Sequence, residues 1–242
     1  MSEALRPHKI EQNESPSSRS IEIYMVRHGK QERYEDNNSP LGPEGELQAK
    51  TFANEIIANC GSNDQQVVIK IKSSSQSRAS RTAEIIEQEL SRKIQELGLT
   101  NIRILTSRES KDLKTTGALG PLMKAGIEYE DSVDEWLGNA DAYPDAKKPA
   151  EAASQIKSMI KSADVLAKRI RPNGPKIVYI WVTHETGSAA LLNEVTGENT
   201  EELGGSIGHL EPMKIVVSKN QEPVVIFRDQ KFSLPTIKNE KS

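Results

Sequence analysis

Short apolar, β-branched runs alternate along this chain with longer segments whose apolar residues recur at helical spacing. The runs are typical of buried strands, and the longer segments are typical of helices that cover a sheet. This alternation favours an α/β fold, a three-layer α/β/α sandwich with a mostly parallel central sheet and an antiparallel edge near the C-terminus. The pattern predicts strands within residues 21–29, 67–72, 102–106, 176–183, 213–218 and 224–228, and helices over residues 44–60, 78–97, 149–170 and 187–194.

The periodicity weakens between about residues 107 and 150, where glycines and acidic residues accumulate. We expect this segment to be a lid insertion in a single domain over residues 21–234, with a disordered N-terminal tail over residues 1–20 and a loose C-terminal tail over residues 235–242. An acidic lid would repel highly phosphorylated sugars and would tolerate a basic or protein substrate. The acidic residues of this segment include Glu128, Glu130, Asp131, Asp134, Glu135, Asp141 and Asp145.

The 242-residue chain has a formal net charge of -3 and no basic block, which argues against nucleic acid or a membrane surface as its partner. Its single cysteine, Cys60, excludes an intramolecular disulfide framework, and we interpret it as a small buried residue near a helix end. No apolar run is long enough to cross a bilayer, and the N-terminal segment lacks the apolar core of a secretory signal. A cytoplasmic location is therefore expected.

Polar, chemically active residues follow three of the predicted strands. The first strand ends in Arg27-His28-Gly29, the second leads through serines to Arg78, and the most apolar strand is followed by His184 and Glu185. On the first triplet alone, an anion site and an ordinary polar strand end are equally good interpretations. Because the carboxyl ends of parallel strands share one edge of a sheet, we expect two histidines and two arginines to converge there. Such a set suits a phosphate dianion.

The order of these motifs resembles the histidine phosphatase (phosphoglycerate-mutase-like) superfamily. That family combines an Arg-His-Gly motif with a later Ser-Ser-Pro-Leu-x-Arg-Ala-x-x-Thr-Ala helix start, and here residues 73–86 read Ser-Ser-Ser-Gln-Ser-Arg-Ala-Ser-Arg-Thr-Ala-Glu-Ile-Ile. Residues 40–49 also resemble the family's Pro-Leu-Thr-x-x-Gly-x-x-Gln-Ala segment, and a histidine follows a late hydrophobic strand. The resemblance covers about residues 21–226.

The resemblance implies a role for each matching residue. His28 would be the nucleophile that accepts the phosphoryl group, Arg27 and Arg78 would clamp the phosphoryl oxygens, and His184 would donate to one of them. The implied function is a phosphatase that hydrolyses a phosphomonoester or phosphoprotein substrate through a phosphohistidine, without a metal or other cofactor. The alternatives are a phosphoglycerate-mutase-type phosphotransferase and a non-catalytic module that binds a phosphorylated ligand.

The proton donor is ambiguous in the sequence. In the large branch of the family it is a glutamate after the third strand, which corresponds to Glu109, and in the acid-phosphatase branch it is a carboxylate directly after the second histidine, which corresponds to Glu185. We favour Glu109 on chain position, and as surface carboxylates either could be inert. His209 lies in a glycine-rich loop and is interpreted as peripheral to the site.

Overall fold

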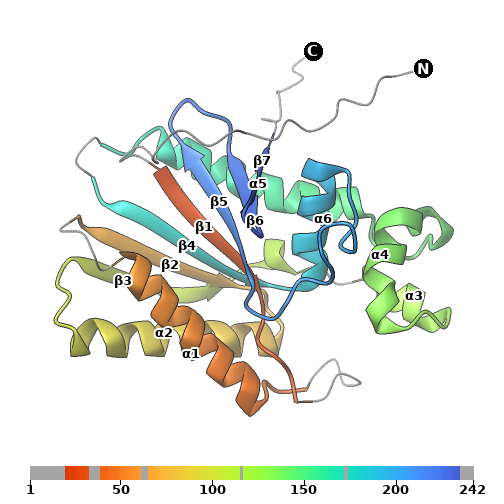
Figure 1. Ribbon diagram of the computed structural model, residues 1–242, viewed down its shortest axis with the longest axis horizontal. Coiled ribbons are helices and arrows are strands. Elements are labelled where there is room, and N and C mark those ends of the chain that lie inside the picture. The colour runs from red at the N-terminus through yellow and green to blue at the C-terminus, as the bar shows by residue number, and fades with distance from the viewer. Residues whose placement is uncertain (1–19, 33–38, 61–64, 115–116, 172–173, 235–242) are drawn as a thin grey trace.

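The computed structural model describes residues 20–32, 39–60, 65–114, 117–171 and 174–234. Within these ranges a twisted sheet lies between two layers of helices (Figure 1). The predicted tails, over residues 1–20 and 235–242, fall outside the described residues except for Ser20, which begins the first strand. The sheet has the order β3-β2-β4-β1-β5-β6-β7, with the strands β1 (Ser20–Arg27), β2 (Val67–Ser73), β3 (Ile102–Glu109), β4 (Lys176–Thr183), β5 (Pro212–Ser218), β6 (Val224–Phe227) and β7 (Gln230–Ser233).

The sheet is mixed, as the sequence predicts. Strands β3, β2, β4 and β1 pair in parallel, while β5, β6 and β7 add an antiparallel edge. The last strand was not predicted. It follows β6 through a two-residue turn at Arg228 and Asp229, whose φ angles are 47° and 62°. A type I′ hairpin turn needs positive φ at both central positions, and an Arg-Asp pair does not carry the usual Asn-Gly signal for that turn.

Helices cover both faces of the sheet because the central strands β1 and β4 alternate their side chains between two apolar cores. Helices α1 (Pro43–Cys60) and α2 (Ser77–Glu96) pack on one face, and α5 (Pro149–Ala167) and α6 (Glu185–Thr196) pack on the other (Figure 1). In β1, Ile21, Ile23 and Met25 belong to the core under α5 and α6, whereas Tyr24 and Val26 belong to the other core. The period of two in the sequence is therefore the origin of the three layers. None of the described helices has the combination of length and apolar composition that a membrane crossing requires.

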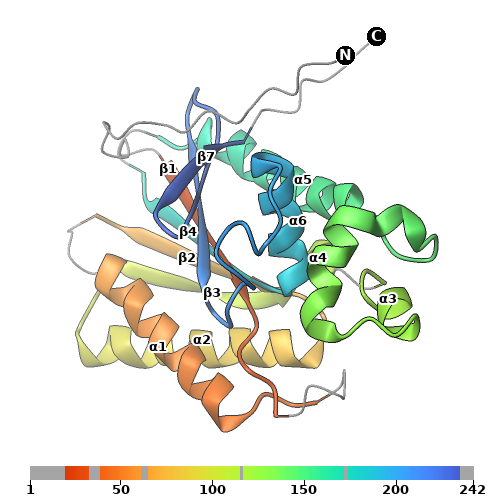
Figure 2. The same ribbon diagram turned by 45° about the vertical axis from the view of Figure 1, so that its right-hand side comes forward.

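The predicted insertion forms a separate small unit beside α6. It contains helices α3 (Gly120–Lys124) and α4 (Tyr129–Asn139) and two short 3-10 turns, Lys111–Leu113 and Ala140–Ala142 (Figure 2). Trp136 of α4 is fully buried at the centre of this unit, and its indole N–H donates to the Lys147 carbonyl oxygen at 2.6 Å. Small residues of α5 and α6, namely Ala152, Ala153 and Ala190, complete the cluster, so the insertion is anchored on the helices of the main domain.

Close backbone packing requires a glycine at the start of α1. The chain after β1 passes so near this helix that a Cβ atom on Gly45 would lie 2.2 Å from the Lys30 carbonyl oxygen, and one on Gly29 would lie 2.6 Å from the Gly45 carbonyl oxygen. One turn later, the Gln48 side-chain oxygen accepts the Lys30 backbone N–H at 3.0 Å. The glycine and the glutamine therefore hold the residues that follow His28 against the helix.

The variant Gly45→Ala is expected to lose about 1–3 kcal/mol of unfolding free energy, because its new methyl group meets backbone atoms that cannot move away by a side-chain rotation. Chemical denaturation monitored by circular dichroism measures this loss. Gly138→Ala is the matched control, since a Cβ atom there meets nothing within 4 Å and the helix α4 would gain up to about 1 kcal/mol. Equal stability of the two variants would contradict the packing argument.

Candidate active site

Three parallel strands end together at one edge of the sheet. The His28 N–H donates to the Thr183 carbonyl oxygen at 2.9 Å, and the Ser74 N–H donates to the Val182 carbonyl oxygen at 2.8 Å. These bonds place the predicted histidines and the serine loop around a pocket of about 540 Å³. The pocket is lined by His28, Ser75, Gln76, Ser77, Arg78, Lys114, Gly117, Ala118, Leu119, Gly120, Met123, Tyr129, His184, Glu185 and Thr186.

The hydrogen bonds of His28 define which of its ring nitrogens is reactive. The Arg78 Nε–H lies 2.8 Å from His28 Nε2, and a guanidinium can only donate, so Nε2 carries a lone pair. The proton is therefore on Nδ1, which donates to the Gly29 carbonyl oxygen at 2.9 Å. Burial, the neighbouring His184 and the cationic Arg78 and Arg27 hold the pKa of His28 well below its usual range. The result is a neutral imidazole with a nucleophilic nitrogen beside Arg78.

His184 lies next to this nucleophile, at the N-cap of α6. The two imidazole rings are 5.2 Å apart between centroids, and His184 Nε2 is 2.9 Å from the Ser74 hydroxyl. Its Nδ1 is buried and has no hydrogen-bond partner within the described part of the chain. Burial and the nearby cations Arg78, Arg27 and Lys114 lower the pKa of His184 to about 3. A phosphoryl oxygen would offer such a buried nitrogen both a partner and a compensating charge.

Arg27 contacts Glu185 rather than the open pocket. Its Nη1 is 2.7 Å from Glu185 Oε2 and also donates to the Ile207 carbonyl oxygen at 3.0 Å, while Nη2 donates to the Tyr129 hydroxyl at 3.3 Å. Both members of the ion pair are almost fully buried. Arg27, the predicted clamp residue, is thus adjacent to the site. Its two terminal nitrogens contact Glu185, the Ile207 carbonyl oxygen and the Tyr129 hydroxyl. Burial raises the pKa of Glu185 despite the opposing influence of Arg27, so this carboxyl retains a proton to higher pH than an exposed glutamate.

Glu109, the proton donor favoured from the sequence, lies outside the pocket. It is the last residue of β3, it is exposed, and its carboxylate accepts the Ser80 hydroxyl at 3.0 Å. Chain position alone did not reveal that β3 is the edge strand, with β2 and β4 between it and β1. Of the two glutamates considered, only Glu185 is among the residues that line the pocket.

Three residues beside the histidines were not anticipated from the sequence as parts of the site. Lys114 and Tyr129 come from the insertion, and both line the pocket. His209, which we interpreted as peripheral, donates from Nδ1 to the His28 carbonyl oxygen at 2.7 Å, and the two rings are 5.5 Å apart. Burial and the charge of Arg27 lower the pKa of His209 to about 4. The glycine-rich context of His209 was a weak signal, since glycines allow a loop to approach a ligand closely.

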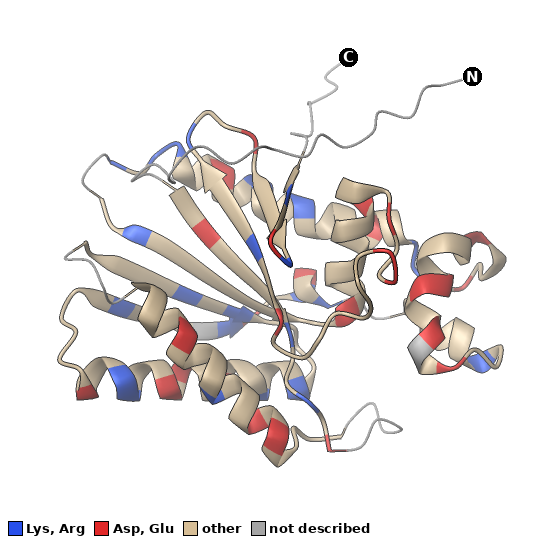
Figure 3. Cartoon of the chain, in the orientation of Figure 1, with Lys and Arg blue, Asp and Glu red and all other residues tan. Residues whose placement is uncertain are grey.

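The acidic side chains of the insertion do not line the pocket in the part that the structure describes. None of the described residues that the insertion contributes to the pocket is acidic. The acidic side chains of α4, red in Figure 3, include two that bond to other parts of the protein. Asp134 accepts both the N–H and the hydroxyl of Thr200, at 2.9 and 2.7 Å, and Glu135 accepts from Asn139 and Tyr143. Two acidic side chains of α4 thus bind neighbouring residues, and the effect of an acidic lid on substrate choice stays a prediction.

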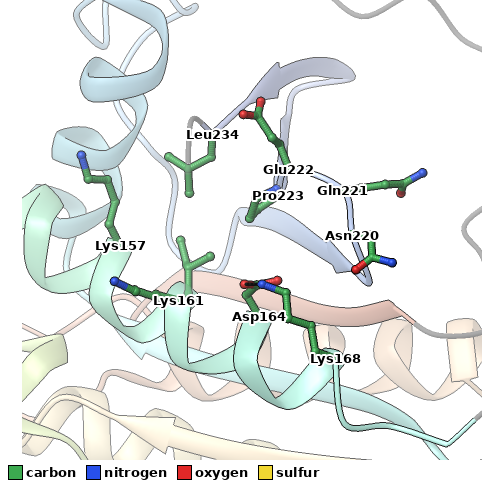
Figure 4. Close-up of a pocket in the computed structure, with 10 residues that line it drawn as sticks. Lys157, Lys161, Asp164, Lys168, Asn220, Gln221, Glu222, Pro223 and Leu234 are labelled. Carbon is green, nitrogen blue, oxygen red and sulfur yellow. Dashed lines mark hydrogen bonds and ion pairs between the residues drawn. The ribbon is translucent and has the colours of Figure 1, made fainter. Parts of the chain in front are cut away.

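A second hollow lies far from the histidines, between α5 and the turn that joins β5 to β6 (Figure 4). It measures about 210 Å³, and two of its lysines are already paired: Lys157 with Glu194 and Lys168 with Asp164, each at 2.6 Å. It therefore offers little free charge for a phosphate. Over the residues that the structure describes, no cluster of three histidine, cysteine or acidic side chains is arranged to hold a metal ion.

Comparisons with known proteins find a matching family model and similar folds. Residues 23–104 match the family model described as histidine phosphatase superfamily (branch 1). The fold resembles that of a mycobacterial glucosyl-3-phosphoglycerate phosphatase, with a TM-score of 0.53 and 15% identity over 81% of this chain and 90% of the other. It also resembles the phosphoglycerate mutase of Bacillus anthracis, with a TM-score of 0.51 and 15% identity over 92% and 93% of the two chains. No curated protein sequence matches the chain significantly.

The buried neutral histidines predict how stability depends on pH. The unfolded chain binds a proton at His184 below about pH 6.5, whereas the folded chain does so only near pH 3, so the contribution of this residue to unfolding free energy falls as the pH falls through that window. Between about pH 7 and about pH 5 the wild type should lose about 1–2 kcal/mol more than the variant His184→Gln. Denaturant titrations at several pH values measure the difference. Parallel curves would show that His184 is not held neutral.

Proposed function

We propose that this chain, whose residues 23–104 match the model of the histidine phosphatase superfamily (branch 1), is a phosphatase whose His28 forms a phosphohistidine intermediate. The single observation that carries the proposal is the tautomer of His28, whose Nε2 is unprotonated and lies beside Arg78. The His28 ring lines the pocket and packs against the ring of His184. The proposed substrate is a phosphomonoester or a phosphoprotein.

In the first step, the substrate phosphate displaces the Arg78 Nε–H from His28 Nε2. The freed nitrogen attacks phosphorus, a P–N bond forms and the P–O bond to the leaving group breaks. Arg78, His184 and Lys114 line the pocket and can donate to the phosphoryl oxygens, and the positive charges of Arg78 and Lys114 stabilise the charge that develops there. The N-termini of α2 and α6 add their backbone dipoles at the same edge.

Glu185 is the proposed proton donor. Its raised pKa allows the protonated carboxyl to deliver a proton to the leaving oxygen, and the resulting carboxylate can then remove a proton from water. That water attacks phosphorus, the P–N bond breaks, and inorganic phosphate and free His28 are released. Arg27, at 2.7 Å from the carboxylate, orients Glu185 and stabilises its ionised form between the two steps.

Replacing the nucleophile tests the proposal directly. His28→Ala should lower kcat/KM for phosphate esters by more than about 10³-fold, because no covalent intermediate can form. The wild type mixed with a labelled phosphate ester and quenched in alkali should carry one acid-labile phosphoryl group that His28→Ala lacks. Tight phosphate binding without turnover in the wild type would instead support a binding module, and transfer of the phosphoryl group to a second alcohol would support a mutase.

The two glutamates provide a matched pair for the proton donor. Glu185→Gln should lower kcat for an alkyl phosphate by about 10²–10⁴-fold, and by much less for a nitrophenyl phosphate, whose leaving group needs no proton. Glu109→Gln should leave both rates nearly unchanged, since its carboxylate lies outside the pocket. A large loss in Glu109→Gln together with a small one in Glu185→Gln would reverse the assignment.

A further inference from the structure

The pocket has an apolar outer wall that the proposed chemistry does not use. Leu119 and Met123, from the segment that enters and forms α3, line the pocket together with Ala118 and the ring of Tyr129 at the start of α4. Met123 is 45% exposed and Tyr129 is 38% exposed, and these are two of only five large hydrophobic side chains so exposed among the described residues. Exposed apolar side chains gathered at the rim of a polar pocket mark a binding surface more often than chance exposure does.

The polar groups of this wall are already committed to the phosphate end of the pocket. The Tyr129 hydroxyl accepts from Arg27, and the charge of Lys114 acts on His184, whose pKa it helps to lower. The remaining described residues that the insertion contributes to the pocket are glycines, Ala118, Leu119 and Met123. The other polar lining residues, Ser75, Gln76, Ser77 and Thr186, come from the main domain. A hydroxyl group placed against the apolar wall itself would lose water without gaining a partner from it.

Leaving-group chemistry points in the same direction. Glu185, which lines the pocket, forms an ion pair with Arg27, and this pairing works against the rise in its pKa that burial causes. A phenol has a pKa of about 10, far below that of an alkyl alcohol, so a phenolate departs with less help from a proton donor. An aromatic leaving group therefore relaxes the demand on the one carboxyl that this pocket provides in its described part.

We propose that the substrates are aryl phosphomonoesters, whose aromatic ring packs between Met123, Leu119 and Tyr129 while the phosphate lies on His28 and Arg78. This inference rests on the proposed function for its catalytic part, but its recognition part can be tested without turnover. The aryl phosphate could come from a free small molecule or from a phosphotyrosine side chain, because both present the same ring and phosphate.

Steady-state kinetics of O-phospho-L-tyrosine and O-phospho-L-serine test the catalytic part. Met123→Ser should lower kcat/KM for phosphotyrosine by about tenfold, the loss expected when part of an aromatic ring is no longer covered, and should leave phosphoserine within about twofold. This comparison removes the intrinsic reactivity of the aryl ester, which is the same for every variant. Leu47→Ser, at an exposed leucine on α1 outside the pocket, is the control and should change neither value. Equal losses for both substrates would overturn the inference.

Binding to a protein that cannot turn over tests the recognition part. Calorimetry of His28→Ala should give at least about tenfold tighter binding of benzylphosphonate than of methylphosphonate, and Met123→Ser in the same background should remove most of the difference. Equal affinities would overturn the aryl-substrate inference even if a phosphohistidine forms in the wild type. A retained benzyl preference in a wild type that hydrolyses no ester would instead overturn the phosphatase and leave the recognition intact. Comparing free phosphotyrosine with a phosphotyrosine peptide then identifies the source of the ring.

Discussion

The backbone hydrogen bond from the His28 N–H to the Thr183 carbonyl oxygen determines the relative position of the two histidine-bearing strands at the sheet edge. It continues the parallel register of β1 and β4 by one residue beyond the last paired position, Arg27 with Thr183. Because His184 directly follows Thr183, the two imidazoles are adjacent without any contact between their own polar atoms. The chemistry of the pocket thus depends on main-chain pairing, which side-chain substitutions in the lid do not disturb.

Positive potential around the buried histidines is the second constraint. Arg78 and Arg27 lie close enough to both histidines to lower their pKa values, and Lys114 adds to this effect at His184. Glu185 forms an ion pair with Arg27. A phosphate dianion would bring negative charge beside Arg78 and Lys114, which a positive potential of this kind favours.

The sequence predicted much of the sheet, because burial on one or both faces leaves a periodic trace. The strand ends and their histidines followed from the parallel topology, and His28, Arg78 and His184 meet as expected. Glu109 did not follow the same logic, since spacing along the chain carries no information on which strand is at the edge. Lys114, Met123 and Tyr129 come from a segment packed around Trp136 and alanines, and such small-residue packing has no recognisable period.

In the insertion, the side chains that stabilise its packing differ from the side chains that are exposed at the pocket. Its buried side, centred on Trp136, rests on α5 and α6, whereas the side chains of Met123 and Tyr129 remain half open to solvent on the opposite side. Mutations at the open positions remove little packing and touch no backbone bond at the sheet edge. A change at Met123 would therefore leave the strand pairing that positions His28 and His184, and the core around Trp136, in place.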